Sequence, residues 1–458
     1  MEQTREEKQF VIMTQTPISR LIPTLAIPTV LSMLITSIYN MGDTYFVSKI
    51  STSAAGAVGV VFSLMAIMQA IGFTIGMGCG TQIAGFLGQK DHEKADILAS
   101  TGLFLSVIIG TCVAIGGLIF IDPLMLLLGS TATILPYARD YASYILIGSP
   151  IICASFVLNN FLRFEGKAAL AMIGITFGGV LNLILDPLFI FGFDLGISGA
   201  AIATLISQCV SLGLLASFFL FKKSAISLRV QHIARQASIY LSIFNRGFPS
   251  FCRQGLASVS TAALNVQAAV YGDPAVAAMS IVGRIFMTIF SIMVGFGQGI
   301  QPILGYNYGA KQYRRVKQVA FCVIQIGTFV MAFFAIAGFI FAPELMALFR
   351  EEDPVVITIG TFALRAYCLA MPLVPIIITC NSAFQVLGKP FATLLASARQ
   401  GVFFFPLISF LPIRYGLMGV QLTQPAADIL AFVTCCFFFA HLIKELDEKI
   451  EIEEGHAV

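Results

Sequence analysis

Residues 71–90, IGFTIGMGCGTQIAGFLGQK, return in altered form at residues 292–311 as IMVGFGQGIQPILGYNYGAK. A shift of 221 residues superposes the two segments without a gap. In this register five positions of the first segment are identical in the second, namely Ile71, Gly76, Gly78, Gly88 and Lys90. A gap-free match over this length is not a chance event, and we conclude that the chain contains an internal repeat.

The repeat extends over nearly the whole chain. Pro28 and Pro249 match at the same shift. Later in each half, the pair Gly166-Lys167 matches Gly388-Lys389, and Gly196 and Gly199 match Gly416 and Gly419, with the register changed by one residue in either direction. Two halves of one architecture are therefore expected.

The composition places the chain in a membrane. Of its 458 residues 57% are hydrophobic and only 11% are charged, less than half the charged share of an average soluble domain. Polar residues this sparse cannot cover so large an apolar core in water. The alternating pattern of a membrane β-barrel is nowhere seen, so the chain is expected to be an all-α, polytopic membrane protein.

Apolar stretches bounded by Gly, Pro or charge predict twelve transmembrane helices, six in each half. They are expected at residues 22–47, 55–82, 96–120, 137–162, 168–191, 197–221, 247–271, 275–302, 318–341, 355–383, 390–412 and 416–442. An even number of spans gives both halves the same orientation, which predicts two six-helix lobes related by a pseudo-twofold axis along the membrane normal. The predicted domains are a lobe at 1–221, a basic cytoplasmic linker at 222–246 and a lobe with a tail at 247–458.

The distribution of charge predicts the orientation. Most basic residues fall in the segments on the side of the N-terminus, and only Lys49, Arg350 and Arg414 fall in the loops on the other side. Basic loops stay cytoplasmic, so both termini are expected inside the plasma (inner) membrane. The polar first fifteen residues predict no removable signal peptide. The small net charge of +3 favours neither nucleic acid nor a polybasic lipid contact, and the ten cysteines form no Cys-x-x-Cys pair.

Two similar bundles in one orientation are typical of an alternating-access transporter with its substrate site between the repeats. No phosphate-binding Gly-x-x-x-x-Gly-Lys-[Ser/Thr] loop occurs, so an ion gradient, H⁺ or Na⁺, is the expected energy source and no cofactor is expected. An intramembrane enzyme is the competing class. Neither His-Glu-x-x-His nor Gly-x-Ser-x-Gly occurs, and we expect no enzymatic activity.

Four oxygen-bearing side chains are expected at one depth, in the outer third of the membrane. Asp43 and Asp186 lie about 18 to 21 residues from the cytoplasmic starts of their spans. Asn182 lies one turn from Asp186 on the same helical face, and Thr204 lies about seven residues into the next, descending span. Such a set suits a Na⁺ ion, or two carboxylates that share a proton. Headgroup water for Asp43, and a helix cap beside Pro187 for Asp186, remain alternatives.

The C-terminal half carries arginines instead. Arg284 falls in the outer half of its span and needs a partner or a water-filled cavity. Asp428 has two possible partners, Arg399 and Arg284, in a structural ion pair. Pro28 removes a backbone hydrogen bond in the first span and is the expected hinge, although static kinks are also common.

The sequence resembles the prokaryotic branch of the multidrug and toxic compound extrusion (MATE) transporters over nearly its whole length. The most specific stretches are Leu181-Asn182-Leu183-Ile184-Leu185-Asp186-Pro187 followed by Gly196-Ile197-Ser198-Gly199-Ala200-Ala201, Leu162-Arg163-Phe164-Glu165-Gly166, and Gln301-Pro302-Ile303-Leu304-Gly305-Tyr306-Asn307-Tyr308-Gly309-Ala310. The resemblance implies a secondary active exporter of amphipathic, often cationic compounds in exchange for H⁺ or Na⁺.

By the same resemblance, Asp43, Asn182, Asp186 and Thr204 are implied to couple the cation, with Tyr39, Tyr141 and Asn159 in the surrounding polar network. A monomer is expected, with small drug-like or organic cations as substrates. A flippase for a lipid-linked precursor is the alternative, because Arg284 and Arg365 would give it a basic cavity for a diphosphate. The acid layer in the first half favours the exporter.

Overall fold

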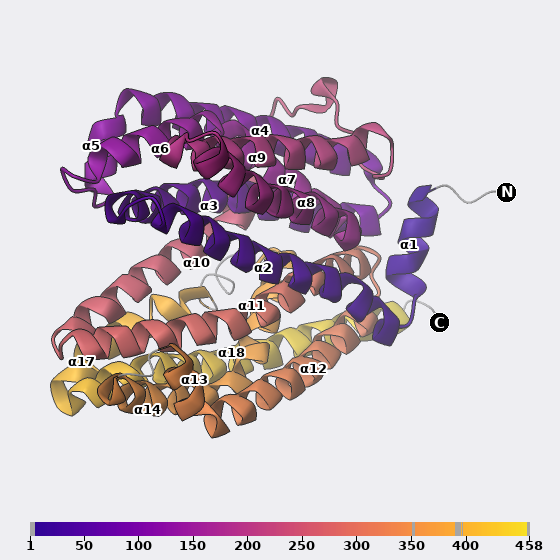
Figure 1. Ribbon diagram of the computed structural model, residues 1–458. Coiled ribbons are helices and arrows are strands. Elements are labelled where there is room, and N and C mark those ends of the chain that lie inside the picture. The colour runs from indigo at the N-terminus through magenta and orange to yellow at the C-terminus, as the bar shows by residue number, and fades with distance from the viewer. Residues whose placement is uncertain (1–4, 350–352, 390–394, 396, 456–458) are drawn as a thin grey trace. The chain divides into compact units, whose positions relative to one another are not determined.

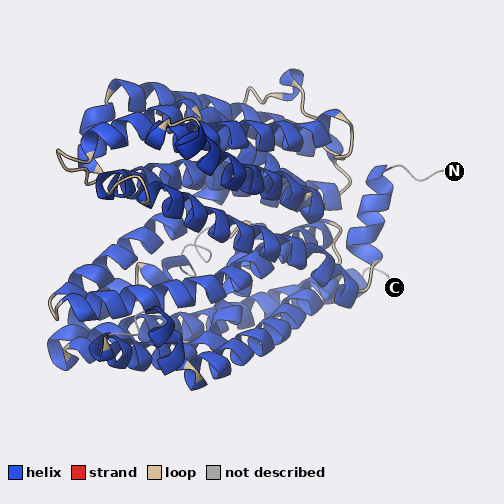
Figure 2. Ribbon diagram, in the orientation of Figure 1, coloured by secondary structure: helices blue, strands red, loops and turns tan. Residues whose placement is uncertain are grey.

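The structure is a computed structural model that describes residues 5–349, 353–389, 395 and 397–455. Every regular element in this part of the chain is helical, and it contains no strand (Figure 2). Helices satisfy their backbone hydrogen bonds internally, as lipid requires. The expected all-α class is confirmed.

Ten helical elements form the first half of the chain (Figure 1). They are α1 (Arg5–Gln15), α2 (Ile18–Ser48), α3 (Thr52–Gly88), α4 (His92–Ile119), α5 (Ile121–Leu127), α6 (Leu135–Ile147), α7 (Ser149–Phe164), α8 (Ala168–Pro187), the π-helical turn η1 (Leu188–Gly192) and α9 (Gly196–Leu220).

The second half follows the same order after a connecting segment. Its elements are η2 (Val230–His232), α10 (Ala237–Ala269), α11 (Asp273–Gly309), α12 (Tyr313–Ile340), α13 (Ala342–Phe349), α14 (Pro354–Ala370), η3 (Met371–Leu373), α15 (Val374–Val386), η4 (Ala398–Gln400), α17 (Phe404–Tyr415) and α18 (Leu417–Gly455).

Each of the twelve predicted spans overlaps a described helix, and residues 390–394 and 396 of the eleventh lie outside the described residues. Nine segments are long and apolar enough to cross a membrane, and α6 with α7 make a tenth that bends by 52° at Gly148. The remaining two are α10 and α17. The helix α10 has 33 residues but carries Arg246 and Arg253, and α17 has only 12 residues within the described chain.

The repeat found in the sequence is also a repeat of secondary structure. A shift of 221 residues carries the first and last residues of α3 onto those of α11, and those of α4 onto those of α12. Backbone details repeat as well. Lys90 and Lys311 follow the equivalent helices α3 and α11, and both adopt a left-handed conformation, with φ of 61° and 60°. This conformation is uncommon for a residue other than glycine, so its recurrence is independent support for the duplication.

The chain packs into two compact units, each with its own apolar core. The first consists of Met1–Met13 and Ile27–Phe251, and the second of Thr14–Ala26 and Cys252–Val458. Helix α2 thus begins in the second unit and continues in the first, whereas α10 begins in the first and continues in the second. The first helix of each repeat therefore starts in the unit that is built mainly from the other repeat.

Two equivalent glycines allow these exchanged segments to pack closely. A side chain at Gly78 of α3 would collide with the backbone of α10 at Ile243 and Gly247. A side chain at Gly299 of α11 would lie 2.6 Å from the Cα of Ala26 in α2. Because Gly78 and Gly299 match in the repeat, the first helix of each repeat packs against the second helix of the other at the same position.

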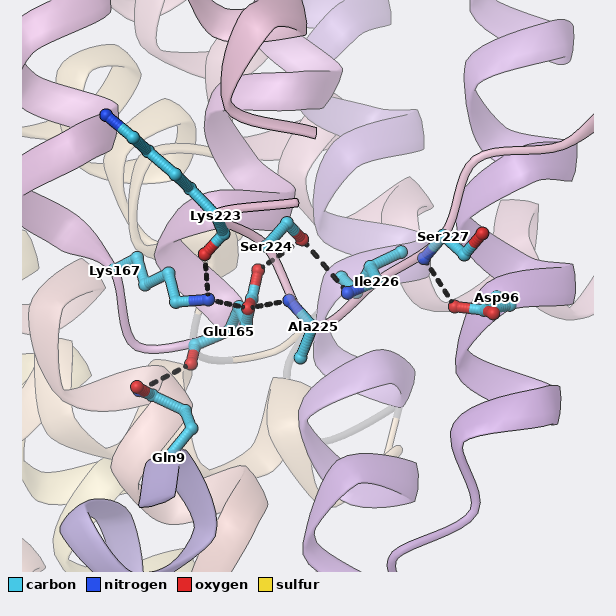
Figure 3. Close-up of polar contacts among 9 residues, drawn as sticks. All are labelled: Gln9, Asp96, Glu165, Lys167, Lys223, Ser224, Ala225, Ile226 and Ser227. Carbon is cyan, nitrogen blue, oxygen red and sulfur yellow. Dashed lines mark hydrogen bonds and ion pairs between the residues drawn. The ribbon is translucent and has the colours of Figure 1, made fainter. Parts of the chain in front are cut away.

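The segment between α9 and α10 binds along the first unit (Figure 3). The backbone N–H of Ser227 donates to the Asp96 carboxylate over 2.7 Å. Those of Arg229 and Ala234 donate to the hydroxyls of Ser100 and Thr101 over 3.1 and 2.9 Å. All three acceptors lie in the first three turns of α4. The connecting segment is therefore a bound strap rather than a loose tether.

Glu165 fixes the start of this strap (Figure 3). Its side chain is fully buried just after α7, where it accepts the Ser224 hydroxyl over 2.7 Å and the backbone N–H of Ala225. The Lys167 ammonium pairs with the same carboxylate. The Glu165 backbone carbonyl accepts the side-chain amide of Gln9 in α1 over 2.9 Å. One residue thus joins α1, the end of α7 and the strap.

Candidate functional site

The distal end of α8, far from the strap, carries the buried carboxylate of Asp186. Asp186 lies 18 residues after the start of α8 at Ala168, which corresponds to about 27 Å along the helix. The helix does not end at Asp186, because Pro187 leads directly into the π-helical turn η1. Asp186 is therefore not the terminal cap that its proline neighbour suggested. Wide turns of this kind are frequent at functional sites.

The glycines of the neighbouring motif shape the next helix. Gly196 has a φ of 55°, the left-handed region that glycine enters at little cost, and it starts α9. A side chain at Gly199 would lie 2.7 Å from the backbone carbonyl of Phe189 in η1. The motif therefore lets the start of α9 pack directly on the turn that follows Asp186, which brings Thr204 of α9 toward α8.

Asn182, Asp186 and Thr204 form one hydrogen-bonded cluster inside the first unit. The Nδ2 group of Asn182 donates to Asp186 Oδ1 over 3.0 Å and lies 3.3 Å from Thr204 Oγ1. The exposed fractions are 4% for Asn182, 0% for Asp186 and 6% for Thr204. A buried carboxylate is costly without compensation, so these polar neighbours stabilise its charge. Three of the four proposed coupling residues are thus in one place.

The coupling role of these residues stays a prediction, and for the fourth of them the position stays a prediction as well. Asp43 belongs to α2, as does Tyr39, but both side chains fall outside the described residues. Tyr141 of α6 is fully buried in the apolar core of the first unit. Its place in a polar network around Asp186 also stays a prediction.

Asn159 lies in a different part of the unit from the cluster. Its side-chain amide donates to the Ala171 carbonyl over 2.9 Å and so ties α7 to the first turn of α8. Ala171 precedes Asn182 by 11 residues, about 16 Å along α8. In this structure Asn159 therefore acts as a helix-packing contact, at the end of α8 expected from its position in the sequence.

The second unit resolves the choice of partner for Asp428. Arg399 Nε lies 2.5 Å from Asp428 Oδ1, and the exposed fractions of the two side chains are only 7% and 2%. The Arg399 guanidinium also lies over the Phe290 ring, 5.0 Å from its centre. Gln424 donates to the same carboxylate oxygen over 2.7 Å. The pair is a buried structural lock, and Arg284 takes no part in it.

Sequence reasoning missed the strap and its acceptors. Glu165 belongs to the Leu162–Gly166 motif, but its position in the sequence assigns it no role. One signal in the sequence was usable. An acidic residue lies directly before Gly166 at the end of an apolar span, and such a residue, if it is buried, needs hydrogen-bond or ionic partners. Its partners, Ser224 and Ala225, lie about sixty residues later.

Together these features define a multi-pass helical membrane protein made of two six-span repeats, with a buried carboxylate, amide and hydroxyl cluster in the first unit. The MatE family model matches residues 28–188 and 249–408, one segment in each repeat. The chain belongs to the MatE family, the MATE transporters.

Curated relatives match over nearly their full length. The multidrug export protein MepA of Staphylococcus haemolyticus is 26% identical over 457 residues, which cover 99% of both chains. MepA of Staphylococcus aureus strain MRSA252 is 26% identical over 416 residues, 91% of this chain and 92% of the relative.

Solved structures agree with the same fold. A crystal structure of a MATE protein in complex with MaD3S has a TM-score of 0.90 at 27% identity and covers 96% of this chain and 99% of that one. The outward-facing conformation of a multidrug resistance MATE family transporter of the MOP superfamily has a TM-score of 0.90 at 26% identity, with 98% and 100% covered. A MATE structure in a bent conformation gives the same TM-score.

Proposed function

We propose that this protein is a secondary active multidrug exporter that moves amphipathic, often cationic compounds out of the cell by alternating access, in exchange for H⁺ or Na⁺. The observation that carries the proposal is the buried Asn182–Asp186–Thr204 cluster. A carboxylate in a spanning helix is expensive in lipid and is retained where it binds a proton or a cation. Full-length similarity to multidrug export proteins supports the substrate class.

Asp186 is the proposed binding group for the coupling ion. A proton or Na⁺ at this carboxylate cancels its negative charge and changes the hydrogen bonds that tie α8 to α9. A cationic substrate and the coupling ion then compete for the same negative charge, which is the basis of exchange. Asp43 is proposed to complete the site from α2.

The orientation of the Asn182 amide favours H⁺ over Na⁺ in this conformation. Its N–H faces the Asp186 carboxylate, and an N–H donor cannot coordinate a metal ion. Na⁺ would require the amide to turn so that Oδ1 faces the ion, whereas a proton can bind Asp186 without that rotation. We therefore propose H⁺ as the coupling ion of this arrangement.

Pro28 is the proposed hinge. The change of unit within α2 falls between Ala26 and Ile27, directly before Pro28. Proline interrupts the backbone hydrogen bonds of a helix and permits it to bend. A bend here would let the rest of α2, with Asp43, respond to the ion bound in the first unit.

We further propose a monomer in the plasma membrane with both termini cytoplasmic, as the basic loops predict. Cysteine labelling tests the orientation in a background without accessible native cysteines. A cysteine beside Arg229 should be protected from an impermeant thiol reagent in intact cells, and one beside Asp273 should react. The opposite pattern would reverse the orientation.

The lipid-precursor flippase is not favoured. It was based on two arginines, but Arg365 donates to the Phe339 carbonyl over 3.2 Å, and its guanidinium lies over the Phe339 ring. Only Arg284 remains available to a ligand. A single guanidinium is a poor match for a diphosphate.

The test uses purified protein in proteoliposomes, with a fluorescent organic cation as substrate and with ΔpH and the Na⁺ gradient imposed separately. Asp186→Asn should abolish concentrative transport and leave a folded, monodisperse protein. Asp194→Asn is the matched control, because Asp194 is exposed in the short connection just beyond η1. Full gradient-driven transport by Asp186→Asn would refute the proposal.

A further inference from the structure

The second unit contains a cavity of about 380 Å³. Helices α10, α11, α14 and α18 contribute to its wall, and its polar residues include Ser260, Asn265, Arg284 and Gln424. Phe286 and Tyr367 line it as well and pack edge to face with their ring centres 5.2 Å apart. A volume at the lower end of the range for ligand pockets, with a few polar groups among aromatic ones, is the usual composition of a small-molecule site.

Arg284 is the one charged residue that lines this cavity, as far as the described residues show. It lies 11 residues into α11, about 16 Å from the start of that helix, and its side chain is exposed. A charged side chain within a spanning helix is costly unless it pairs with a counter-charge or faces water. No carboxylate in the described part of the chain forms an ion pair with Arg284.

The carboxylate that the sequence offers as a partner for Arg284, that of Asp428, already pairs with Arg399. Asp428 could neutralise Arg284 only by leaving Arg399, and the buried Arg399–Asp428 pair is further held by Gln424 and by the Phe290 ring. Breaking a buried pair leaves an uncompensated charge and is strongly destabilising. The cavity therefore keeps one net positive charge that the protein itself does not neutralise.

Asn265 adds a second group suited to an anion. It lies on α10 in the wall of the same cavity, and its amide makes no hydrogen bond to any described residue. An amide N–H and a guanidinium together can bind the two oxygens of a carboxylate, and Arg is the side chain with the geometry for two parallel bonds to such a group.

We propose that this cavity binds the anionic group of an amphipathic substrate, such as a carboxylate, with Arg284 as counter-charge and Asn265 as hydrogen-bond donor. The inference rests on the proposed export function and specifies its substrates. Compounds that carry an anionic group on an apolar body are therefore substrates as well as cations. The aromatic wall at Phe286 and Tyr367 packs against the apolar body of the substrate.

The experiment compares two ligands that differ only in the anion: a rhodamine with a free benzoic acid, and the methyl ester of the same dye. Binding is measured by fluorescence polarisation on the purified full chain in phosphatidylcholine nanodiscs. Arg284→Gln should weaken binding of the acid at least about tenfold, the value of a charged hydrogen bond, and leave binding of the ester unchanged. Arg284→Lys should restore part of the difference.

Arg365→Gln is the matched control, because Arg365 also lies in a spanning helix but does not line the cavity. It should leave both affinities unchanged. Equal loss of both ligands in Arg284→Gln, or no loss of either, would overturn the proposal, as would a wild-type protein that does not bind the acid. Competition by added phosphatidylglycerol would assign the cavity to a lipid headgroup and would also overturn it.

The binding experiment on Arg284 and the transport test of the proposed function can fail independently of each other. Binding of the acid through Arg284 requires no ion gradient. If Arg284-dependent binding is found but proteoliposomes show no gradient-driven transport, the export proposal fails and the anion site stands. If transport of the ester is driven by ΔpH but Arg284→Gln binds the acid normally, the reverse holds.

Discussion

Asn182 donates a hydrogen bond of 3.0 Å to Asp186, four residues further along α8, and the same nitrogen reaches Thr204 on α9. The Asn182 amide therefore contacts both of the other two residues of the cluster. Its role is therefore to hold the carboxylate of α8 in a fixed position relative to α9. Removal of the amide should therefore affect the proposed ion coupling while it leaves the Asp186 carboxylate, the proposed ion-binding group, in place.

Asn182→Ala should lower the initial rate of gradient-driven transport at least about tenfold, because Asp186 loses a hydrogen bond to a charged acceptor. The measurement is initial uptake of an organic cation into proteoliposomes under a fixed ΔpH. Thr204→Val is the companion variant and should have a smaller effect, since Thr204 contacts the Asn182 amide rather than the Asp186 carboxylate. An unchanged rate in Asn182→Ala would show that the amide has no part in coupling.

Glu165→Gln should loosen the strap. The carboxylate binds Ser224, Ala225 and Lys167, and an amide keeps only one acceptor oxygen for them. Loss of charged hydrogen bonds at a fully buried site should cost about 2 to 3 kcal/mol of local stability. Trypsin should then cut at Lys222 or Lys223 at least about tenfold faster than in the wild type, measured by gel under native conditions.

Glu93→Gln is the control for the strap, because Glu93 lies on the first turn of α4 and does not bind the residues that Glu165 binds. It should leave the rate of cleavage unchanged. A Glu165→Gln protein that is cut no faster than the wild type would show that the strap is held by its other contacts alone.

Removal of one partner from the Arg399–Asp428 pair should be more damaging than removal of both. Asp428→Leu alone leaves a buried guanidinium and should cost about 3 to 5 kcal/mol. The double variant Arg399→Met/Asp428→Leu should recover most of this loss, because two apolar side chains need no counter-charge. Reversible unfolding in mixed SDS micelles gives the free energies for the cycle. Additive losses would mean that the two side chains do not interact.

Gly78→Ala should disrupt the contact of α3 with α10. The new methyl group would meet the Ile243 carbonyl, and backbone cannot move aside as a flexible side chain can. Gly85→Ala is the matched control on the same helix, with nothing within 4 Å of its added carbon. It should be neutral or stabilising by up to about 1 kcal/mol, since alanine favours a helix over glycine. The temperature of thermal unfolding should therefore fall for Gly78→Ala and stay the same or rise for Gly85→Ala, and equal shifts would contradict the packing.

The sequence predicted the helices and the Asn182–Asp186–Thr204 cluster for physical reasons. A helix that spans lipid needs a long apolar stretch, which is visible in the local sequence, and the helical period places Asn182 and Asp186 on one face.

The ion-pair partner of Asp428 could not be predicted in this way. Arg399 and Arg284 both lie in predicted spans of the same half, and only the tertiary packing, which places the Arg399 guanidinium over the Phe290 ring and beside Asp428, decides which one meets Asp428.

The strap could not be predicted, because its hydrogen bonds join groups far apart in the chain. Ser227 and Asp96 are separated by 131 residues, and their bond uses a backbone N–H that any residue type would supply. The basic composition of residues 222–246 gave no indication of these partners. Asp186 could be predicted because a charged residue in the middle of a span costs free energy in lipid and therefore needs a reason to be there. Glu165 could not, because it lies at the end of a span, where a charged residue is ordinarily exposed to water and its burial cannot be foreseen.

The exchange of first helices bears on how such a chain arose. Residues Thr14–Ala26 pack with the second unit, and the start of α10 packs with the first. A single repeat on its own would expose the groove at Gly78 where a first helix should lie, and its own first helix would extend beyond its bundle. An ancestor with only six spans could have been complete only as a swapped homodimer, in which each copy lent that helix to the other. Fusion of the two genes would then have made permanent an arrangement that began as subunit exchange.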